Sequence, residues 1–251
     1  MIISFVIVEY FSIEEVSICI KNIQSTLGNY EKKEIIISSN SCYSLDIQKK
    51  ILSEYPAIQW VFNSKNGGFA YAMNRGLEVA VGEILIIMNP DVRLKFGIEK
   101  MIHYSYSHNE IGIIAPQIIN VEGKTQDSFR SFITPIRFIK RQLNRWLIGE
   151  KNIDNINTPK NVDWVIGAFM MIPRKAYDTV GELDEHYFLY CEDMDICTRM
   201  YQKGFEVIYY PNAVVEYEGT RSARKSLKYA WIFFNSLFHY WKKFGFIVTR
   251  R

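Results

Sequence analysis

Residues 66–92, NGGFAYAMNRGLEVAVGEILIIMNPDV, contain a turn, a helix, a strand and a polar tip in succession. The segment Asn66-Gly67-Gly68 has the composition of a turn, because glycine adopts positive φ angles freely and lets other groups approach the backbone. Apolar residues recur at helical spacing over 70–79 and predict a helix. Gly82 is expected to end this helix as a C-terminal cap.

The segment after this helix has the pattern of a buried strand with a polar tip. Residues 83–88 are mostly Ile and Leu, which is typical of a strand inside a parallel sheet. Pro90 has no N–H to donate, so the chain is expected to leave the sheet at Asn89. Asp91 then lies just past the carboxyl end of a strand, where open α/β sheets bind ligands. An ordinary βαβ unit with a solvated aspartate fits the same residues, so this stretch alone leaves both interpretations open.

Strand and helix patterns alternate along the rest of the chain. Strands are predicted over 2–8, 34–38, 58–62, 111–119, 162–172 and 205–210, and helices over 13–27, 45–54 and 174–180. This alternation predicts an α/β fold, with a mostly parallel sheet that carries helices on both faces. Gly167-Ala168 is expected to break one of these strands, and Pro211 is expected to close the last.

The composition is that of a globular domain. Of the 251 residues 48% are hydrophobic, which is enough for a full core. No apolar run reaches the ~18–20 residues of a membrane-spanning helix. The start, MIISFVIVEYF, has no basic segment and alternates like a strand, so no signal peptide is expected. The four cysteines form no CxxC pair and are interpreted as free thiols in a reducing cytoplasm.

The C-terminal part is basic and aromatic. The chain has a net charge of +3, yet no acid follows Glu218 and eight bases do: Arg221, Arg224, Lys225, Lys228, Lys242, Lys243, Arg250 and Arg251. This asymmetry indicates an anionic partner. A helix is predicted from Leu227, with an apolar stripe at spacing 3–4: Leu227, Ala230, Trp231, Phe234, Leu237, Phe238, Trp241 and Phe244. The stripe fits packing on the core and also peripheral contact with an anionic membrane interface.

The 66–92 stretch resembles the nucleotide-sugar half of glycosyltransferase family 2, which has the GT-A fold, and is most similar to its bacterial rhamnosyltransferase-like branch. The resemblance covers nearly the whole chain. It implies a domain over 1–218, made of a nucleotide-sugar half (1–119), a mobile acceptor-side insert (120–161) and an acceptor or catalytic half (162–218). A basic, aromatic, amphipathic C-terminal helix over 219–251 completes the chain.

The insert has no clear sheet pattern. It contains GKTQDSFRSF, which is similar to the start of the family's acceptor-side loop, and IRFIKRQLNRWLI, which fits an amphipathic helix. A loop of this length inside a compact domain is usually a lid, a binding loop or disordered, and a mobile acceptor-side segment is favoured. A solvated surface helix remains the alternative for its second half.

The resemblance implies a set of donor-binding residues. The tips of the first two strands, Glu9-Tyr10 and Ser39-Asn40, would hold the base and the ribose. Ser39 stands where the family usually has an aspartate, which leaves the base open, and a plain polar turn is the alternative. The other expected donor contacts are Asn66, Gly68, Phe69, Asn74, Asn89, Asp91, Gly167, Ala168 and Arg221.

The same resemblance implies a divalent cation, Mg²⁺ or Mn²⁺, bound with the donor diphosphate. Asp91 is its expected ligand, and Asn89 replaces the first acid of the usual Asp-X-Asp. The family often adds a ligating histidine near position 216, but the four histidines of this chain lie elsewhere, and the position falls on Glu216 or Tyr217. Glu216 is predicted to substitute as an oxygen ligand.

The acidic stretch 181–199, GELDEHYFLYCEDMDICTR, resembles the family's acceptor-side motif. Asp193 matches the catalytic base, and its neighbour Glu192 is assigned to the same catalytic pair. Asp195 and Arg199 are four residues apart, so an ion pair is expected between them and Asp195 is interpreted as structural. The alternative for the whole cluster is stabilisation of a helix N-terminus, where carboxylates are favoured by the dipole.

The resulting hypothesis is a cytoplasmic, inverting glycosyltransferase, located at the inner face of the plasma membrane if the tail binds lipid. It would move a sugar, with rhamnose or another deoxyhexose from a dTDP donor favoured, onto a growing and lipid-linked bacterial surface glycan. No nucleic-acid partner is expected. The rival is a non-catalytic homologue that binds a glycan or a partner, as Asn89, Ser39 and the missing histidine suggest. A nicotinamide dehydrogenase is disfavoured, because no GxGxxG follows the first strand.

Overall fold

The computed structural model describes residues 1–28, 32–138, 156–219 and 226–246. The larger sheet contains nine described strands in the order β3-β2-β1-β4-β10-β6-β11-β5, with β8 also paired to β11. These strands are β1 (Ile3–Glu9), β2 (Lys33–Ser39), β3 (Gln59–Phe62), β4 (Ile84–Met88), β5 (Arg93–Phe96), β6 (Ile111–Ile119), β8 (Lys160–Asn161), β10 (Phe169–Pro173) and β11 (Glu206–Glu216). A second, two-stranded sheet joins β7 (Phe129–Arg130) to β9 (Trp164–Val165).

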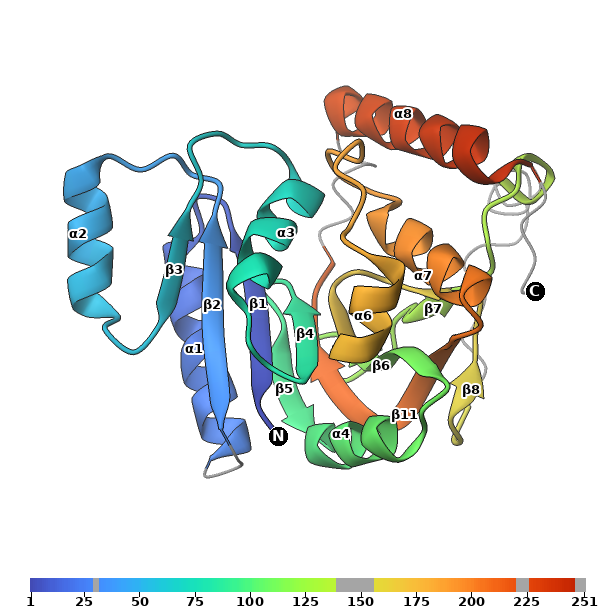
Figure 1. Cartoon of the computed structure of the whole chain (residues 1–251), viewed down its shortest axis with the longest axis horizontal. Helices are drawn as coiled ribbons and strands as arrows, with labels where there is room; N and C mark the ends of the chain where they lie inside the picture. Colours follow the sequence, from blue (N-terminus) through green and yellow to red (C-terminus); the bar gives the residue numbers. More distant parts are fainter. Residues whose placement is uncertain (29–31, 139–155, 220–225, 247–251) are drawn as a thin grey trace.

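Helices cover both faces of the sheet, as predicted (Figure 1). They are α1 (Ile13–Leu27), α2 (Leu45–Glu54), α3 (Phe69–Val79), α4 (Ile98–Ser107), α6 (Arg174–Val180), α7 (Glu192–Gln202) and α8 (Leu227–Phe244). Along β1, Val6 faces one core with α3, α6, α7 and α8, while Phe5 and Ile7 face the other with α1 and α4. This alternation follows from the pleat of a strand that is buried on both sides.

An antiparallel strand divides the sheet into two parallel groups. Strands β3, β2, β1 and β4 are parallel to one another, and β6 and β11 form a second parallel pair. Between them, β10 is antiparallel to both β4 and β6. Gly167-Ala168 separates β9 from β10, so the predicted break in the 162–172 strand is confirmed. The start of β10 therefore lies beside the end of β4, which places Ala168 next to the Asn89 tip.

Two predicted element ends are wrong. Helix α3 ends at Val79 with Ala80 as its C-cap, and Gly82 lies beyond it. A Cβ on Gly82 would come within 2.4 Å of Ser4 Oγ, so the glycine is needed for close packing against β1. Strand β11 continues past Pro211 to Glu216. The proline is tolerated because the pairing register with β6 shifts between Tyr210 and Val214.

Other elements had no prediction. Strand β5 and helix α4 follow the Asn89–Asp91 tip, and β5 pairs with the end of β11. Within the 120–161 insert, β7 and β8 are short strands and residues 135–138 are helical, so this part contains some regular structure. The predicted amphipathic helix spans 136–148, and its residues 139–148 lie outside the described residues.

The C-terminal helix α8 packs on the domain, and it lies across the top of Figure 1 above α7. Leu237 and Tyr240 are fully buried, and the indole N–H of Trp241 donates to the carbonyl of Ile133 at 2.6 Å. Tyr240 is therefore part of the packing face, although the predicted stripe does not include it. Over the described residues, no helix is both long enough and apolar enough to span a bilayer.

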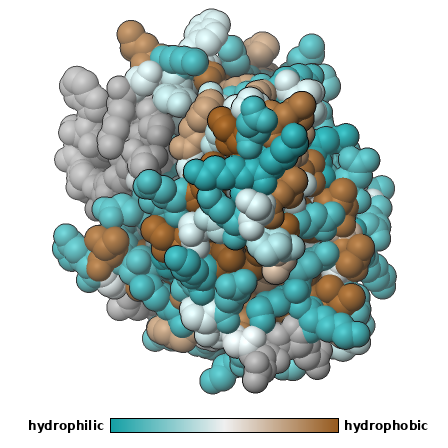
Figure 2. Space-filling view, turned by 90° about the vertical axis from the view of Figure 1, so that its left-hand side faces the viewer, coloured by the Kyte–Doolittle hydropathy of each residue, from teal (hydrophilic) through white to brown (hydrophobic). Residues whose placement is uncertain are grey.

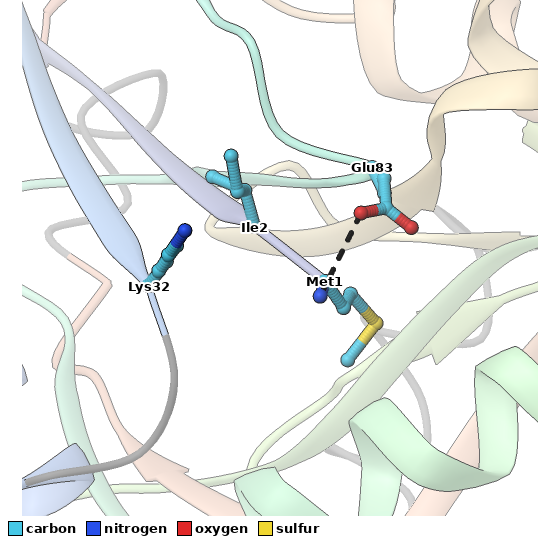
Figure 3. Close-up of a pocket in the computed structure, with 4 residues that line it drawn as sticks. All are labelled: Met1, Ile2, Lys32 and Glu83. Carbon is cyan, nitrogen blue, oxygen red and sulfur yellow. Dashed lines mark ion pairs between the residues drawn. The ribbon is translucent and has the colours of Figure 1, made fainter.

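An open pocket of about 420 Å³ lies at the amino-terminal edge of the parallel strands. It is lined by Met1, Ile2, Lys32 and Glu83, and the Met1 ammonium lies 3.7 Å from Glu83 (Figure 3). Ligands of open α/β sheets bind at the opposite, carboxyl edge. On the side of α2, Figure 2 shows apolar and hydrophilic groups interspersed. Neither region is a candidate for the functional site.

Candidate functional site

The tips of β1 and β2 are joined by the carboxylate of Glu9. Its oxygens accept hydrogen bonds from the Ser12 N–H at 2.8 Å, from the hydroxyls of Ser39 and Ser41, and from the Tyr43 hydroxyl at 3.0 Å. Glu9 is fully buried and Ser39 is 1% exposed. Glu9 was predicted to contact the donor, but the structure places its carboxylate behind the surface, where it fixes the two strand tips relative to each other.

Exposed aromatic rings lie above this network. Tyr10 is 53% exposed and Phe11 is 68% exposed, and their ring centroids are 4.9 Å apart. The ring of Tyr43 lies edge-on to Phe11 at 5.9 Å. Sequence reasoning included Tyr10 but missed Phe11 and Tyr43. The signal for them was the presence of aromatic residues directly after both strand tips.

The Asn66–Gly68 turn is held by side-chain amides. Asn40 donates to the carbonyl of Gly68 at 2.9 Å and accepts from Asn63 at 3.1 Å. The Asn66 side chain accepts from the Gly68 N–H at 3.1 Å. Gly68 has φ +95°, and a Cβ there would lie 2.2 Å from the carbonyl oxygen of Phe188. Asn40 and Gly68 thus connect the β2 tip to the segment that precedes α7.

Asn74 and Phe69, both predicted to contact the donor, lie on α3 and face the protein. The Asn74 side chain exchanges two hydrogen bonds with the backbone of Leu183, at 2.9 and 3.0 Å, and also donates to Glu185. It is 1% exposed. Phe69 packs against the core, and its N–H donates to the carbonyl of Phe188 at 2.8 Å. Both residues position the 182–191 segment.

The polar tip after β4 carries Asn89 and Asp91, both predicted donor contacts, and lies close to Tyr217. The Asn89 N–H donates to the Ala168 carbonyl at 3.0 Å, and its side-chain amide donates to the Tyr217 hydroxyl at 3.4 Å. Asp91 is half-buried, and burial raises the pKa of its carboxyl even though Arg93 acts to lower it. Burial and the nearby Asp91 raise the pKa of Tyr217 to about 12, so this phenol stays protonated.

Glu216 and Tyr217 have different environments at the end of β11. The Glu216 carboxylate forms an ion pair with Lys95 at 2.8 Å. Tyr217 is the residue that reaches the Asn89 tip. The Glu216 carboxylate, which was predicted to bind the metal, is therefore already paired with Lys95. Arg221, predicted to contact the diphosphate, lies outside the described residues.

Asp193 is held by two backbone donors. The Gly167 N–H donates to Asp193 Oδ2 at 2.9 Å, and the Met194 N–H donates to Oδ1 at 2.8 Å. Asp193 lies in the first turn of α7, which begins after Tyr190 and Cys191 at φ 71° and 68°. Consecutive left-handed residues other than glycine carry a conformational cost, which is tolerated when the surroundings fix them. Here Tyr190 and Cys191 set the direction in which α7 begins, and therefore the position of the Asp193 side chain.

The adjacent acids perturb one another. Glu192 is 6% exposed, and burial together with the charge of Asp193 raises the pKa of its carboxyl well above the usual range. Its Oε2 has no hydrogen-bond partner among the described residues. Burial also raises the pKa of Asp193, while the Gly167 and Met194 N–H groups and the charge of Arg130 act to lower it. Glu192 is thus favoured as the neutral acid and Asp193 as the carboxylate.

Asp195 is structural, as predicted. Its fully buried carboxylate accepts from Arg199 Nε at 2.6 Å, from Lys243 Nζ at 2.6 Å and from the Tyr187 hydroxyl at 3.2 Å. The predicted pair with Arg199 is confirmed, and Lys243 adds a contact from α8. This network anchors the helix that carries Asp193.

Three hydrogen bonds and the covalent Gly167-Ala168 step connect Asp193 to the polar tip and Tyr217. Asp193 is bonded to Gly167, the next residue Ala168 is bonded to Asn89, and Asn89 is bonded to Tyr217. Arg130, which sequence reasoning did not single out, is close enough to influence Asp193 and comes from the predicted acceptor-side segment. The base candidate and the Asp91 tip therefore belong to one site at the carboxyl edge of β4.

Comparison with known proteins identifies the family. The model of "Glycosyl transferase family 2" matches residues 4–181, which include the whole Asn66–Asp91 region and the Gly167-Ala168 step. The chain belongs to glycosyltransferase family 2.

Curated relatives are rhamnosyltransferases and a hexosyltransferase. The N-acetylglucosaminyl-diphospho-decaprenol L-rhamnosyltransferase of Mycobacterium tuberculosis is 26% identical over 185 residues, 65% of this chain and 60% of that protein. The low-salt glycan biosynthesis hexosyltransferase Agl10 of Haloferax volcanii is 24% identical, over 81% of this chain and 63% of its own length. Rhamnosyltransferase WbbL of Escherichia coli is 22% identical, over 76% and 75%. The match thus spans about 60% of the mycobacterial and archaeal relatives.

Solved structures share the fold. GalNAc-T7 with UDP, GalNAc and Mn²⁺ superposes with a TM-score of 0.66 at 13% identity, over 86% of this chain and 44% of that one. The mannosyltransferase PcManGT from Pyrobaculum calidifontis, in complex with GDP-Man and Mn²⁺, gives 0.57 at 15% identity, over 85% and 56%. These likenesses confirm the predicted GT-A-like arrangement of this family-2 chain.

Proposed function

We propose that this family-2 chain is an inverting glycosyltransferase that moves a sugar from a nucleotide-diphosphate donor to a glycan acceptor. The observation that carries the proposal is the short connection between Asp193 and the Asn89–Asp91 tip through Gly167-Ala168. Transfer from a nucleotide sugar needs a base for the acceptor hydroxyl and positive charge for the leaving diphosphate. Asp193 is the candidate for the base, and the Asn89–Asp91 tip is the candidate to hold a cation against the diphosphate.

Asp193 is the proposed general base. One N–H occupies each of its carboxylate oxygens, and each oxygen keeps a further lone pair for an acceptor hydroxyl. The neutral form of Glu192 avoids a second negative charge beside it. Deprotonated Asp193 accepts the hydroxyl proton while the acceptor oxygen attacks the anomeric carbon and the diphosphate leaves. This single displacement inverts the configuration at that carbon.

The tip supplies oxygen ligands that fit a hard cation. Asp91 offers a carboxylate, and Asn89 uses its amide nitrogen toward Tyr217, which leaves the amide oxygen available. Oxygen ligands of this kind suit Mg²⁺ or Mn²⁺ together with phosphate oxygens. When bound, the cation would neutralise charge on the leaving diphosphate. Tyr217 still has its own hydroxyl proton to donate to a phosphate oxygen, since it acts only as acceptor toward Asn89.

The donor and acceptor are proposed from the relatives. Two relatives are rhamnosyltransferases, and the mycobacterial one is named for a diphospho-decaprenol acceptor. A deoxyhexose such as rhamnose from a dTDP donor, and a lipid-linked bacterial surface glycan, are accordingly favoured. The exposed rings of Tyr10 and Phe11 beside the β1 tip offer a surface on which a pyrimidine base can stack.

Peripheral contact with the cytoplasmic membrane leaflet is part of the proposal. Leu227, Trp231, Phe234 and Phe238 share one face of α8 and are 92%, 68%, 50% and 66% exposed. The exposed Lys228 and Lys242 flank this face, and the sequence has no acid after Glu218. Aromatic side chains beside lysines suit an anionic membrane interface. A lipid-linked acceptor would be reached from the same surface.

A ligand screen followed by a transfer assay tests the proposal. Nucleoside diphosphates and their sugars are compared by thermal shift, with and without Mn²⁺, because a ligand that binds the folded state raises its stability. A shift with dTDP or dTDP-rhamnose that requires Mn²⁺, followed by transfer to a lipid-diphosphate sugar, is expected. Binding without hydrolysis or transfer would favour the rival, a non-catalytic homologue, for which Asn89 and the Glu216–Lys95 pair are the motivating observations.

A further inference from the structure

A second group of metal-ligand side chains lies between the 182–191 segment and α8, outside the proposed transfer site. Asp184, His186 and His239 each offer one ligand atom, and all three atoms lie within 4.8 Å of one another. The Asp184 carboxylate is 2.8 Å from His186 Nδ1 through one oxygen and 3.3 Å from His239 Nε2 through the other. Two ring nitrogens therefore converge on one carboxylate.

The separations are close to those of a tetrahedral transition-metal site. Zn²⁺ binds nitrogen and carboxylate oxygen at about 2.0–2.2 Å, which places neighbouring tetrahedral ligands about 3.3 Å apart. The nitrogen–oxygen distance to His239 matches that value, and the distance to His186 is 0.5 Å shorter. The His186 side chain is 79% exposed, so it can adjust, and water has access to a fourth position. Imidazole ligands favour Zn²⁺, Co²⁺ or Ni²⁺ over the Mg²⁺ and Mn²⁺ expected at an all-oxygen site.

Lys243 is the group with which a metal would compete. Its ammonium lies 2.7 Å from Asp184 Oδ2 and 2.6 Å from Asp195 Oδ2. A metal that takes Asp184 leaves Lys243 paired with the buried Asp195, so no buried charge loses its last partner. The lysine lowers the affinity for a cation by like-charge repulsion and by its bond to the Asp184 oxygen that His239 also approaches.

We propose that Asp184, His186 and His239 form a binding site for Zn²⁺ or a similar transition-metal ion. The site joins the turn at 184–186 to α8 and so fastens the helix to the segment that leads into α7. It does not depend on glycosyl transfer, because its ligands are separate from Asp91 and Asp193. A bound ion would stabilise the folded state by mass action.

Titration of the full-length, metal-free protein with Co²⁺ tests the site, because a tetrahedral Co²⁺ centre with histidine ligands absorbs visible light. The His239→Gln variant should bind Co²⁺ about tenfold or more weakly. The control His103→Gln, which alters an exposed histidine on α4, should bind like the wild type. Asp91→Ala should also retain this signal, which separates the site from the diphosphate tip. Zn²⁺ should displace Co²⁺ and raise the melting temperature of the wild type more than that of His239→Gln.

Lys243→Met provides a second arm with an opposite sign. It removes the competing ammonium and keeps the aliphatic stem, so Co²⁺ affinity should increase. Equal affinities for wild type and His239→Gln, or the absence of saturable binding, would overturn the proposal. An unchanged affinity in folded Lys243→Met would also overturn it, since it would mean that the ion does not contact Asp184.

Discussion

The backbone N–H of Gly167 donates to Asp193 Oδ2 at 2.9 Å, across the step that separates β9 from β10. The carboxylate is therefore oriented by main-chain atoms rather than by another side chain. A Cβ on Gly167 would lie 3.3 Å from the Asp193 Cβ, a tight contact that would require the Asp193 side chain to shift slightly. An asparagine at 193 keeps the shape of the side chain but can accept only one of the two N–H bonds from Gly167 and Met194, so its activity has to be compared at matched folded fraction.

Asp193→Asn should reduce turnover by about 10²–10⁴, since that is the usual contribution of a general base. Donor affinity should change little, because Asp193 is assigned to the acceptor hydroxyl rather than to the donor. The measurement is the initial transfer rate and the donor dissociation constant at matched folded fraction. In contrast, Asp195→Asn should mainly lower stability, by about 3–5 kcal/mol, as expected when a buried ion pair loses one partner. Near wild-type transfer by Asp193→Asn would mean that the base is a different residue.

Glu192→Gln should stabilise the protein, and the gain should increase with pH. The pKa of Glu192 is raised in the folded state by burial and by Asp193. The contribution of the protonated Glu192 carboxyl to stability is fully present below the unfolded pKa of about 4.3. It is lost as the pH rises through the folded pKa, because the buried carboxyl must then ionise. Urea denaturation of both proteins from pH 4 to pH 8 measures the difference.

Asp184→Asn provides a control of opposite sign for that experiment. Burial acts to raise the pKa of Asp184, but hydrogen bonds from Lys243 and His186 outweigh it and hold the pKa below its usual range. Its contribution is present above the unfolded pKa of about 3.9 and is lost as the pH falls through the folded pKa. The variant should be less stable at neutral pH, with the gap closing in acid. Parallel pH profiles for the two variants would contradict both assignments.

Asp91→Ala should abolish the Mn²⁺ dependence of donor binding while the fold survives. Asp91 is the only carboxylate in the Asn89–Asp91 tip, so its loss removes the strongest ligand there. Isothermal titration of the nucleoside diphosphate with and without Mn²⁺ measures the effect. Asn89→Asp, which restores a second acid, should keep or strengthen the metal requirement. Equal donor affinities for Asp91→Ala and wild type in Mn²⁺ would exclude Asp91 as the ligand.

The double variant Trp231→Gln/Phe238→Gln should weaken binding to anionic vesicles without unfolding the protein, because both side chains are exposed on α8. Wild-type binding should also fall as salt rises, since charges are screened. Co-sedimentation with vesicles containing phosphatidylglycerol measures the effect. Leu52→Gln on α2, where an apolar residue is 47% exposed, is the matched control. If the double variant and the control bind alike, the α8 face is not the anchor.

Local patterns predicted most elements, because each depends on neighbours in sequence. The helices at 13–27, 45–54 and 174–180 have the predicted bounds, and so does the strand at 111–119. The Asp195–Arg199 pair was equally local. Gly82 was misjudged because its role depends on Ser4, which is distant in sequence. Pro211 was misjudged because a register shift with β6 removes the need for its missing N–H.

The site was predictable as a set of strand tips but not as a set of contacts. Glu9 and Asn74 were chosen as ligand contacts, yet their polar atoms are engaged by Ser41 and Leu183. Such partners are distant in sequence, so the periodicity of apolar residues does not reveal them. The approach of Arg130 to Asp193 and that of Tyr217 to Asn89 arise in the same way. For α8, the periodicity predicted an apolar stripe but did not say that Phe233 would pack on the core and Phe234 would lie half-exposed.

The contacts between α8 and the 182–195 region also bear on the order of folding. Domains generally begin to fold from the N-terminal side during synthesis. Asp195 is made well before Lys243, so α7 of the nascent chain carries a carboxylate that has Arg199 but still lacks the ammonium from α8. The turn that leads to Asp193 should therefore settle last, after the helix at 227–244 has left the ribosome. A pause or truncation between Gln202 and Leu227 would yield a domain with its sheet formed and α7 without its contact to Lys243.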